Sequence, residues 1–377
     1  MSSLQPHIVF AGGGTAGHLF PGIAVAEYLS RALPKVRITF ALAGKSLETR
    51  LISAAGFRFV AIPSRPMPRT PAEAFSFLAT SFSGYRAASH FLQQEQASLV
   101  VGLGGYASVP TARAAARRKL PLVLLEQNAV PGRATRWLAS SASSICLAFE
   151  QAKPYFRDTS NVRVIGNPVR AAFGKADRHA RFERGATRTR QLLVLGGSGG
   201  SRTLNDQAPR ALYKARAAIA GWRIVHQTGE RNAQAVRALY EKFGLPATVT
   251  TFFDDVPRMF EETDLAISRA GGTTLAELAM LGVPSILVPY EKASDNHQRQ
   301  NADVFRAAGA ATLVDPRDAP GRLDDRLSEA VVRLAYHTEL RRRMAESMFE
   351  LARPNAARAV ARTIREVLRS RQLASVA

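Results

Sequence analysis

The feature that most constrains the fold is a short apolar run that ends in a glycine-rich loop and continues into a helical pattern. The chain contains this unit clearly twice. The first copy has an apolar run over 8–11, a loop over 12–18 and a helical pattern that passes through residues 23–29, and the second has the run 191–195 and the loop 196–202. Strand, loop and helix in this order build parallel sheets. The sequence therefore predicts an α/β fold with two Rossmann-like domains in tandem.

The length of 377 residues agrees with two domains, because one domain usually takes roughly 100–200 residues. Residues 166–190 are largely polar and charged and show little hydrophobic periodicity, which is typical of a linker. We expect an N-terminal domain over 1–165, a linker or hinge over 166–190 and a C-terminal domain over 191–345. Residues 346–377 form a helical segment that could pack back on the N-terminal domain.

The composition is that of a folded protein, with 46% apolar residues and 21% charged ones. A single cysteine, Cys146, excludes an internal disulfide framework and a cysteine-based zinc site. The chain has no run near the roughly 18 apolar residues of a spanning helix and no export signal at its start, so we expect it in the cytoplasm. The net charge of +21 attracts polyanions, although an arginine-favouring genome would also scatter basic residues in this way.

Glycine loops between a strand and a helix can bind anions, because their N–H groups approach a phosphate and the helix N-terminus adds positive charge. A third such loop follows the strand pattern near 100–101, at 102–105. Gly12, Gly14 and Gly17 match the spacing of a dinucleotide fingerprint, but no acidic residue ends the second strand at 36–42. A dinucleotide cofactor is therefore disfavoured. We expect the loops to face one cleft between the domains.

Beside the glycine loops, the chain carries a set of short motifs at residues 13–22, 102–106, 126–128, 166–170, 196–202, 268–277, 282–290 and 295–302. Taken together, these motifs resemble those of the MurG family, the inverting UDP-N-acetylglucosamine transferases of peptidoglycan synthesis. The resemblance spans nearly the whole chain. It implies the GT-B architecture, two facing Rossmann-like domains with parallel sheets and an interdomain cleft. The donor would bind the C-terminal domain and the acceptor the N-terminal one.

The resemblance implies that the chain moves N-acetylglucosamine from UDP-GlcNAc to undecaprenyl-pyrophosphoryl-MurNAc-pentapeptide (lipid I), giving lipid II. Gly272 and the threonines after it open a helix whose N–H groups can hold the diphosphate, and Glu277 can accept both ribose hydroxyls. Gln298 and Asn301 share a helix face, where amides can hydrogen-bond sugar hydroxyls. The expected UDP-GlcNAc residues are Thr15, Ala16, Gly17, Asn128, Arg170, Ser198, Phe253, Gly272, Thr273, Thr274, Leu275, Ala276, Glu277, Gln298 and Asn301.

For the chemistry, His18 is the favoured general base, because an imidazole with a pKa of roughly 6.5 suits proton removal at neutral pH. Binding of a phosphate or of the acceptor is the alternative role of His18, and Glu126, at the end of the strand pattern 122–125, is the rival base. Gly104, Gly105 and Tyr106 are expected at the acceptor. Preorganised N–H donors can stabilise the departing diphosphate, and no Asp-x-Asp motif ends a strand, so we expect neither a metal nor a cofactor.

The lipid-linked acceptor implies contact with the cytoplasmic face of the cell membrane. Phe75, Leu78, Phe82 and Tyr85 recur at helical spacing, with Arg69, Arg86 and the basic run 117–119 as candidate flanks. This stripe predicts an interfacial helix for anionic inner-leaflet lipids, and a core-facing amphipathic helix is the alternative.

Two other functions stay open at this point. A related GT-B transferase could act on another lipid, such as diacylglycerol, because the first glycine loop does not separate the two acceptors. A basic nucleic-acid-binding protein is a remote alternative, since the chain lacks zinc spacing, an aromatic-rich basic motif and a concentrated basic stripe. We therefore expect no nucleic-acid partner. An oxidoreductase is disfavoured by the missing acidic residue.

Overall fold

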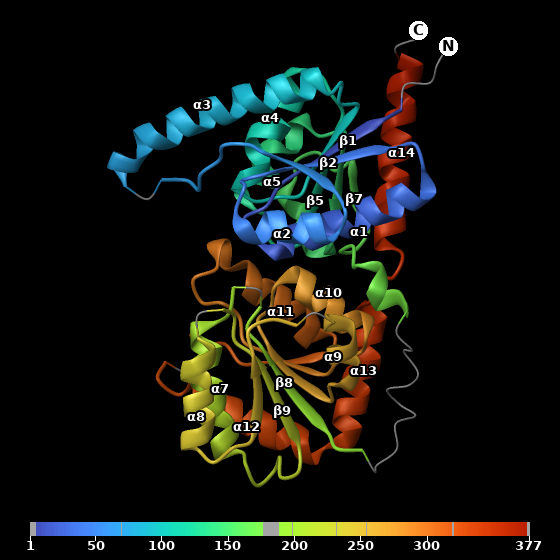
Figure 1. The fold of residues 1–377 in the computed structure, drawn as a ribbon. Helices are drawn as coiled ribbons and strands as arrows, with labels where there is room; N and C mark the ends of the chain where they lie inside the picture. The colour runs from blue at the N-terminus through green and yellow to red at the C-terminus, as the bar shows by residue number, and fades with distance from the viewer. Residues whose placement is uncertain are drawn as a thin grey trace. The chain divides into compact units, whose positions relative to one another are not determined.

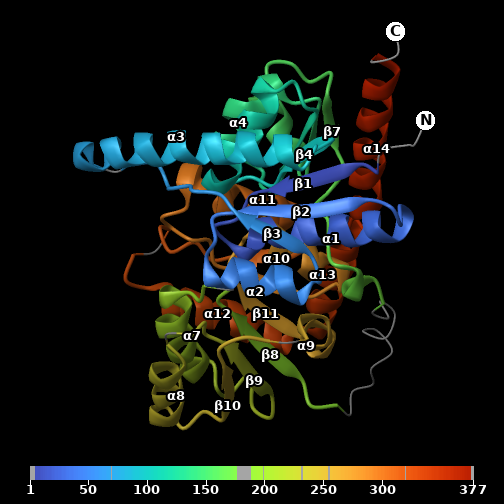
Figure 2. The same cartoon turned by 45° about the horizontal axis from the view of Figure 1, so that its top comes forward.

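A computed structural model describes residues 5–68, 70–175, 188–197, 199–230, 232–253, 255–318 and 320–374 (Figures 1 and 2). The chain divides into two compact units. The first consists of Met1–Ala171 and Arg353–Ala377, and the second of Ala172–Ala352. The chain thus returns to the first unit at Arg353, later than the expected boundary after residue 345.

The first unit is built on a seven-stranded parallel sheet in the order β3-β2-β1-β4-β5-β6-β7. Side chains of β1 alternate between two apolar layers, with Ile8 and Phe10 in one and Val9 and Ala11 in the other. Both faces of the sheet are covered, which explains the continuous apolar run in the sequence. The strands are β1 His7–Ala11, β2 Arg37–Leu42, β3 Arg58–Ala61, β4 Leu99–Gly102, β5 Leu122–Glu126, β6 Ser144–Leu147 and β7 Val162–Val164.

Helices cover both faces of this sheet. The layer of Ile8 and Phe10 receives apolar side chains from α1, α2 and the C-terminal helix α14, and the opposite layer receives them from α3 and α4. The N-terminal half of α3 extends beyond the other helices of its unit (Figures 1 and 2). The helices are α1 Ala16–Ala32, α2 Ser46–Ala54, α3 Pro71–Gln94, η1 Tyr106–Ser108, α4 Val109–Arg117, α5 Arg133–Leu138, η2 Ala139–Ser141, η3 Glu150–Tyr155 and α14 Ala356–Ala374.

The second unit repeats the plan with a six-stranded parallel sheet in the order β10-β9-β8-β11-β12-β13. Its strands are β8 Gln191–Leu195, β9 Arg223–Gln227, β10 Ala247–Thr250, β11 Leu265–Ser268, β12 Ser285–Leu287 and β13 Ala311–Leu313. Its helices are η4 Ala171–Lys175, which begins at the boundary, α7 Arg202–Lys214, α8 Ala233–Lys242, α9 Val256–Glu262, α10 Gly272–Met280, η5 Ser294–Asn296, α11 His297–Ala307, α12 Leu323–Tyr336 and α13 Thr338–Leu351.

The strand registers place the glycine loops within each unit. Ala11, the last residue of β1, pairs with Gly102 of β4, so the loops that follow these strands start side by side. In the second unit, Leu195 of β8 pairs with Gln227 of β9 and with Ser268 of β11. In both sheets the strand order reverses beside these positions, and open parallel sheets bind ligands outside the carboxyl ends of their strands at such a point.

Cys146 is a free thiol in the core of the first unit, and burial raises its pKa to about 12. Across the described residues, no helix combines the length and the apolar character needed to cross a bilayer.

Candidate active site

A buried carboxylate accepts a hydrogen bond from the backbone of the first glycine loop. Glu48, in the first turn of α2, is 1% exposed, and its Oε1 accepts a hydrogen bond of 2.5 Å from the backbone N–H of Gly14. Its Oε2 accepts one of 3.2 Å from the N–H of Lys45. Glu48 was not among the expected site residues, because the N-cap residue of α2 is Lys45 and the recognisable capping-box pattern has a serine or threonine there. This loop therefore carries its own anion.

His18 lies in the first turn of α1 against the third glycine loop. Its Nδ1 is 3.1 Å from the hydroxyl of Thr15, the N-cap residue of α1. A Cβ at Gly104 would lie 3.3 Å from the imidazole, and one at Gly105 would lie 3.4 Å from it. Both glycines have positive φ, +88° and +70°. The two glycines thus allow the left-handed backbone of this turn, and their missing side chains leave room for the imidazole ring.

Other residues of the first turn of α1, and Tyr106, which we expect at the acceptor, lie near the imidazole of His18. Ala16 is buried and Gly17 half-buried in the first turn of α1. A Cβ at Gly14 would lie 3.4 Å from the ring of Tyr106, and the ammonium of Lys45 is 5.5 Å from the centre of that ring. Residues from three loops of the first unit therefore meet at one place.

Glu126 has its carboxylate engaged by the loop that follows β5. Its Oε1 accepts hydrogen bonds of 3.1 Å from the backbone and from the side-chain amide of Asn128, and its Oε2 accepts one of 3.0 Å from the N–H of Gly132. The side chain is 4% exposed. The neighbouring Gln127, to which we had assigned no role, donates to the carbonyl of Leu103 at 3.0 Å. Gln127 thus ties the loop after β5 to the third glycine loop. The carboxylate of Glu126 fixes the backbone of the loop after β5.

Arg170 belongs to the first unit, one residue before the end of its segment Met1–Ala171. Its guanidinium lies 4.1 Å from the centre of the Phe20 ring, which extends from α1. This places Arg170 beside the helix that carries His18.

The second glycine loop continues into α7 through Ser201, which is the N-cap residue. The Ser201 hydroxyl accepts a hydrogen bond of 3.2 Å from the N–H of Leu204 and one of 2.9 Å from Nε of Arg269. Ser198, expected at the donor phosphates, lies outside the described residues.

Arg269 is a buried cation beside this loop. It is 9% exposed, and its Nη1 donates to the carbonyls of Val288 and Pro289 at 3.1 and 2.7 Å. Burial lowers the pKa of Arg269 to about 10, so the guanidinium stays charged at neutral pH. Arg269 falls in the motif 268–277, but the sequence pattern gives no sign of its contact with Ser201.

Helix α10 begins at Gly272 with no side-chain cap and no acidic residue in its first turn. Thr273 and Glu277 are buried, each 6% exposed, and Thr274 is half-buried. Leu275 is fully buried in the core, so only its backbone can touch a ligand; Ala276 is half-buried. The first-turn N–H groups are therefore arranged to receive an anion.

Gln298 and Asn301 both lie on α11 and differ in what they contact. The amide oxygen of Gln298 accepts a hydrogen bond of 2.9 Å from the N–H of Tyr290. Asn301 is fully buried and donates to the carbonyl of Ala270, two residues before α10, at 3.0 Å. The side chain of Asn301 thus supports the loop that precedes α10, and its contact with the sugar stays a prediction.

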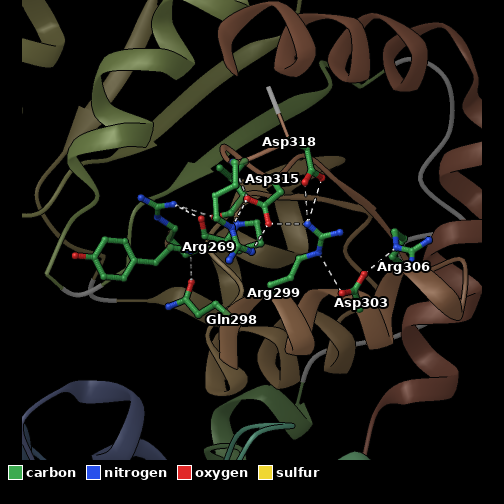
Figure 3. Close-up of polar contacts among 11 residues, drawn as sticks. Arg269, Gln298, Arg299, Asp303, Arg306, Asp315 and Asp318 are labelled. Atoms are coloured by element: carbon green, nitrogen blue, oxygen red, sulfur yellow. Dashed lines mark hydrogen bonds and ion pairs between the residues drawn. The ribbon is translucent and has the colours of Figure 1, made fainter. Parts of the chain in front are cut away.

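Ion pairs anchor α11 in this position (Figure 3). Arg299 contacts Asp303 at 3.1 Å, Asp315 at 2.8 Å and Asp318 at 3.2 Å. Burial alone would raise the pKa of Asp315, but hydrogen bonds from Arg317 and Arg299 lower it to about 2. The carboxylate is thus charged at any physiological pH, and the helix face that carries Gln298 is held in place.

Phe253 lies three residues after the end of β10 and is half-buried.

The expected site residues that the structure describes lie in two groups, one in each unit. No set of three or more histidine, cysteine or acidic side chains is placed to hold a metal ion among the described residues.

The two parallel sheets, each with its glycine loop at the switch point, define the GT-B class of glycosyltransferases. Residues 8–147 match the glycosyltransferase family 28 N-terminal domain, and residues 191–360 match the C-terminal domain of that family. The chain belongs to the MurG family within this class, the UDP-N-acetylglucosamine–N-acetylmuramyl-(pentapeptide) pyrophosphoryl-undecaprenol N-acetylglucosamine transferases.

Two relatives and one solved structure illustrate the family likeness. The transferase of Geobacter sulfurreducens is 35% identical over 354 residues, which cover 94% of this chain and 96% of the relative. That of Sorangium cellulosum is 37% identical over 368 residues, covering 96% and 89%. The crystal structure of Acinetobacter baumannii MurG superposes with a TM-score of 0.73 at 28% identity and covers 96% of this chain and 99% of that one.

Proposed function

We propose that this chain transfers N-acetylglucosamine from UDP-GlcNAc to the 4-hydroxyl of the muramyl sugar in undecaprenyl-pyrophosphoryl-MurNAc-pentapeptide, with inversion at the anomeric carbon. The product is the disaccharide lipid of peptidoglycan synthesis. The family match over nearly the whole chain supports the reaction. The observation that carries the donor assignment is the buried, charged Arg269 beside the second glycine loop.

The second unit can stabilise the leaving UDP electrostatically. Negative charge grows on the departing diphosphate in the transition state, and preorganised donors stabilise that state more than the ground state. In this proposal the first turn of α10 and the Arg269 guanidinium supply positive charge, and Glu277 accepts the ribose hydroxyls. Gln298 turns its amide nitrogen to the sugar, since its amide oxygen is engaged by Tyr290.

His18 acts as the general base in this proposal. In this role Nδ1 donates its proton to the Thr15 hydroxyl, which orients the ring, and the unprotonated Nε2 takes the proton of the attacking hydroxyl. Glu126 is the weaker candidate, because three N–H groups engage its carboxylate. We assign Glu126 to positioning Asn128, and we place the acceptor at Tyr106 and at the turn of Gly104 and Gly105.

The acceptor is lipid-linked, and we propose that α3 contacts the cytoplasmic face of the cell membrane. Phe75, Leu78 and Phe82 are 83%, 64% and 63% exposed. Tyr85 differs, because it packs against the core of the first unit. The guanidinium of Arg86 is 5.8 Å from the centre of the Phe82 ring, and Arg118 of the basic run donates to Ser89 on α3. Exposed aromatic side chains with basic neighbours suit anionic lipids. Arg69 lies outside the described residues.

A calorimetric titration with UDP-GlcNAc, UDP-glucose and NAD, at physiological salt and without added metal, tests the donor. We expect saturable binding selective for UDP-GlcNAc, and formation of the disaccharide lipid when the acceptor is then supplied. Binding of NAD alone would overturn the proposal. Transfer to diacylglycerol in place of the muramyl lipid would move the chain to the related lipid glycosyltransferases.

Co-sedimentation with vesicles of phosphatidylglycerol and phosphatidylethanolamine tests the membrane contact. The double variant Phe75→Ser/Phe82→Ser should bind these vesicles several-fold more weakly than the wild type. Tyr336→Ser is the matched control, because Tyr336 is 66% exposed on α12 of the second unit. Equal vesicle binding by all three proteins would remove α3 from the contact.

A further inference from the structure

Gln227, the last residue of β9, joins two segments that end at the same edge of the second sheet. Its side chain is 3% exposed. Its amide nitrogen donates to the carbonyl of Gly197, in the second glycine loop, at 3.0 Å and to the carbonyl of Thr251, directly after β10, at 3.1 Å. Both partners are acceptors, so only the nitrogen end of the amide fits between them.

The glycine loop rests directly on the backbone around Gln227. The N–H of Gly196 donates to the Gln227 carbonyl at 3.2 Å. Gly200 has a φ of +73°, and a Cβ there would lie 2.2 Å from the carbonyl oxygen of Thr228. No side chain fits between the loop and this segment, so a displacement of residues 227–228 displaces the loop as well.

Neutral, buried side chains fix the position of residues 226–228 through hydrogen bonds. Asn205 of α7 donates to the Thr228 carbonyl at 3.0 Å, and its amide oxygen is 3.2 Å from Nε2 of His226. Nδ1 of His226 is 3.0 Å from the hydroxyl of Tyr240. The connected, buried groups give the end of β9 one arrangement.

We infer that Gln227 is a positioning residue of the donor site. It sets the separation between the loop expected at the donor phosphates and the 251–253 segment, whose Phe253 the family resemblance places with its backbone next to the uracil of the donor. The inference rests on the proposed function, because Ser198 of the loop and Phe253 of the second segment are among the residues expected to bind UDP-GlcNAc. A single planar amide bonded to both carbonyls fixes their spacing, and small misplacements of binding groups weaken affinity and rate strongly.

The chain offers a matched control in Gln191, the first residue of β8. Gln191 is also fully buried, and its amide nitrogen donates to Thr263 at 3.1 Å. Like Gln227, it has an amide oxygen with no partner among the described residues. It lies at the amino end of the same parallel sheet, away from the glycine loops. Its loss tests burial and hydrogen bonding without touching the donor segments.

The experiment compares Gln227→Leu with Gln191→Leu in the full chain, by calorimetry with UDP, by the KM for UDP-GlcNAc and by thermal unfolding. Both variants should unfold at a lower temperature. Only Gln227→Leu should raise the Kd for UDP and the KM for UDP-GlcNAc, by about tenfold, which is the effect of about one lost hydrogen bond on affinity. Gln227→Met, unbranched and of similar length, gives the same test if leucine does not fit.

Equal UDP affinity of wild type and the Gln227 variants would overturn the inference. A rise of the same size in the Gln191 variant would do so as well, because the effect would then be one of stability alone. A wild-type protein that binds no UDP-GlcNAc would contradict the proposed function instead, so the two failures are distinguishable.

Discussion

The two glycine loops that follow β1 and β8 share one sequence signature and differ in charge. The first has the buried carboxylate of Glu48 bonded to the N–H of Gly14. The second has the buried guanidinium of Arg269 bonded to its N-cap residue Ser201. The same strand, loop and helix thus present a negative group in one unit and a positive group in the other. A glycine loop alone does not define a phosphate site, because the side chains behind it decide which charge it favours.

The N-cap residues differ in the same sense. The Ser201 hydroxyl bonds to the first turn of α7, whereas the Thr15 hydroxyl makes no cap bond and contacts His18. The second loop is therefore arranged around an anion, and the first around a side chain that can move a proton. This division matches the proposed roles, with the donor in the second unit and the base in the first.

The largest expected effect is that of His18→Ala. We expect kcat to fall by about 10²–10⁴, because general-base catalysis contributes that much, while the affinity for UDP is kept. Steady-state kinetics with the lipid-linked acceptor and calorimetry with UDP measure the two quantities. A loss of UDP affinity as large as the loss of kcat would place His18 at the donor and remove the division between the loops.

Glu277→Ala should come next. Loss of a hydrogen-bonded carboxylate is worth about 1.5–3 kcal/mol, so we expect the Kd for UDP to rise about 10- to 100-fold. Glu329→Ala, a carboxylate 63% exposed on α12, is the control and should bind UDP like the wild type. Unchanged UDP binding by the Glu277 variant would remove the donor assignment from the second unit.

Glu48→Ala tests the charge behind the first loop. We expect a loss of about 1–3 kcal/mol in the free energy of unfolding, since the N–H of Gly14 loses its buried acceptor. Turnover should fall and the Kd for UDP should stay the same. Tighter UDP binding in this variant would show that the first loop receives the donor diphosphate, with Glu48 repelling it in the wild type.

The smallest effect concerns pH and the neutral network under the second loop. Burial lowers the pKa of His226 to about 3, whereas the unfolded chain has the ordinary value of 6.5. Between these values the unfolded state binds more protons, so stability falls as the pH drops from 6.5 toward 3. The loss is at most about 1.4 kcal/mol per pH unit. His226→Phe should be less stable at pH 7 and should show a flatter decline below pH 6.5.

Denaturant titrations in a Trp137→Phe background measure this difference, because the chain has two tryptophans and Trp222 then reports on the second unit alone. Tyr240→Phe is the control, since it removes one partner of His226 and keeps the buried imidazole. Burial also lowers the pKa of His7 in the first unit, so the comparison is made between variants that all keep His7. If the free energy of unfolding declined below pH 6.5 as steeply in His226→Phe as in the wild type, His226 would not be the group that causes the decline.

Much of the fold followed from local patterns. The apolar runs that enter glycine loops predicted both parallel sheets, because strand, loop and helix occupy consecutive residues and their periodicity is local. The stripe on α3 shows the limit of such patterns. Helical spacing grouped Phe75, Phe82 and Tyr85, but the tertiary packing exposes the two phenylalanines and turns the tyrosine to the core.

By itself, then, the sequence determined the α/β class, the tandem of two glycine-loop units and the family. Only the tertiary structure decided which side chains complete each loop. Glu48 reaches Gly14 across 34 residues, Arg269 reaches Ser201 across 68 and Asn301 reaches Ala270 across 31. The physical reason is that such contacts depend on which strand ends become neighbours in the sheet and on how each helix packs against it. Local periodicity carries no record of either.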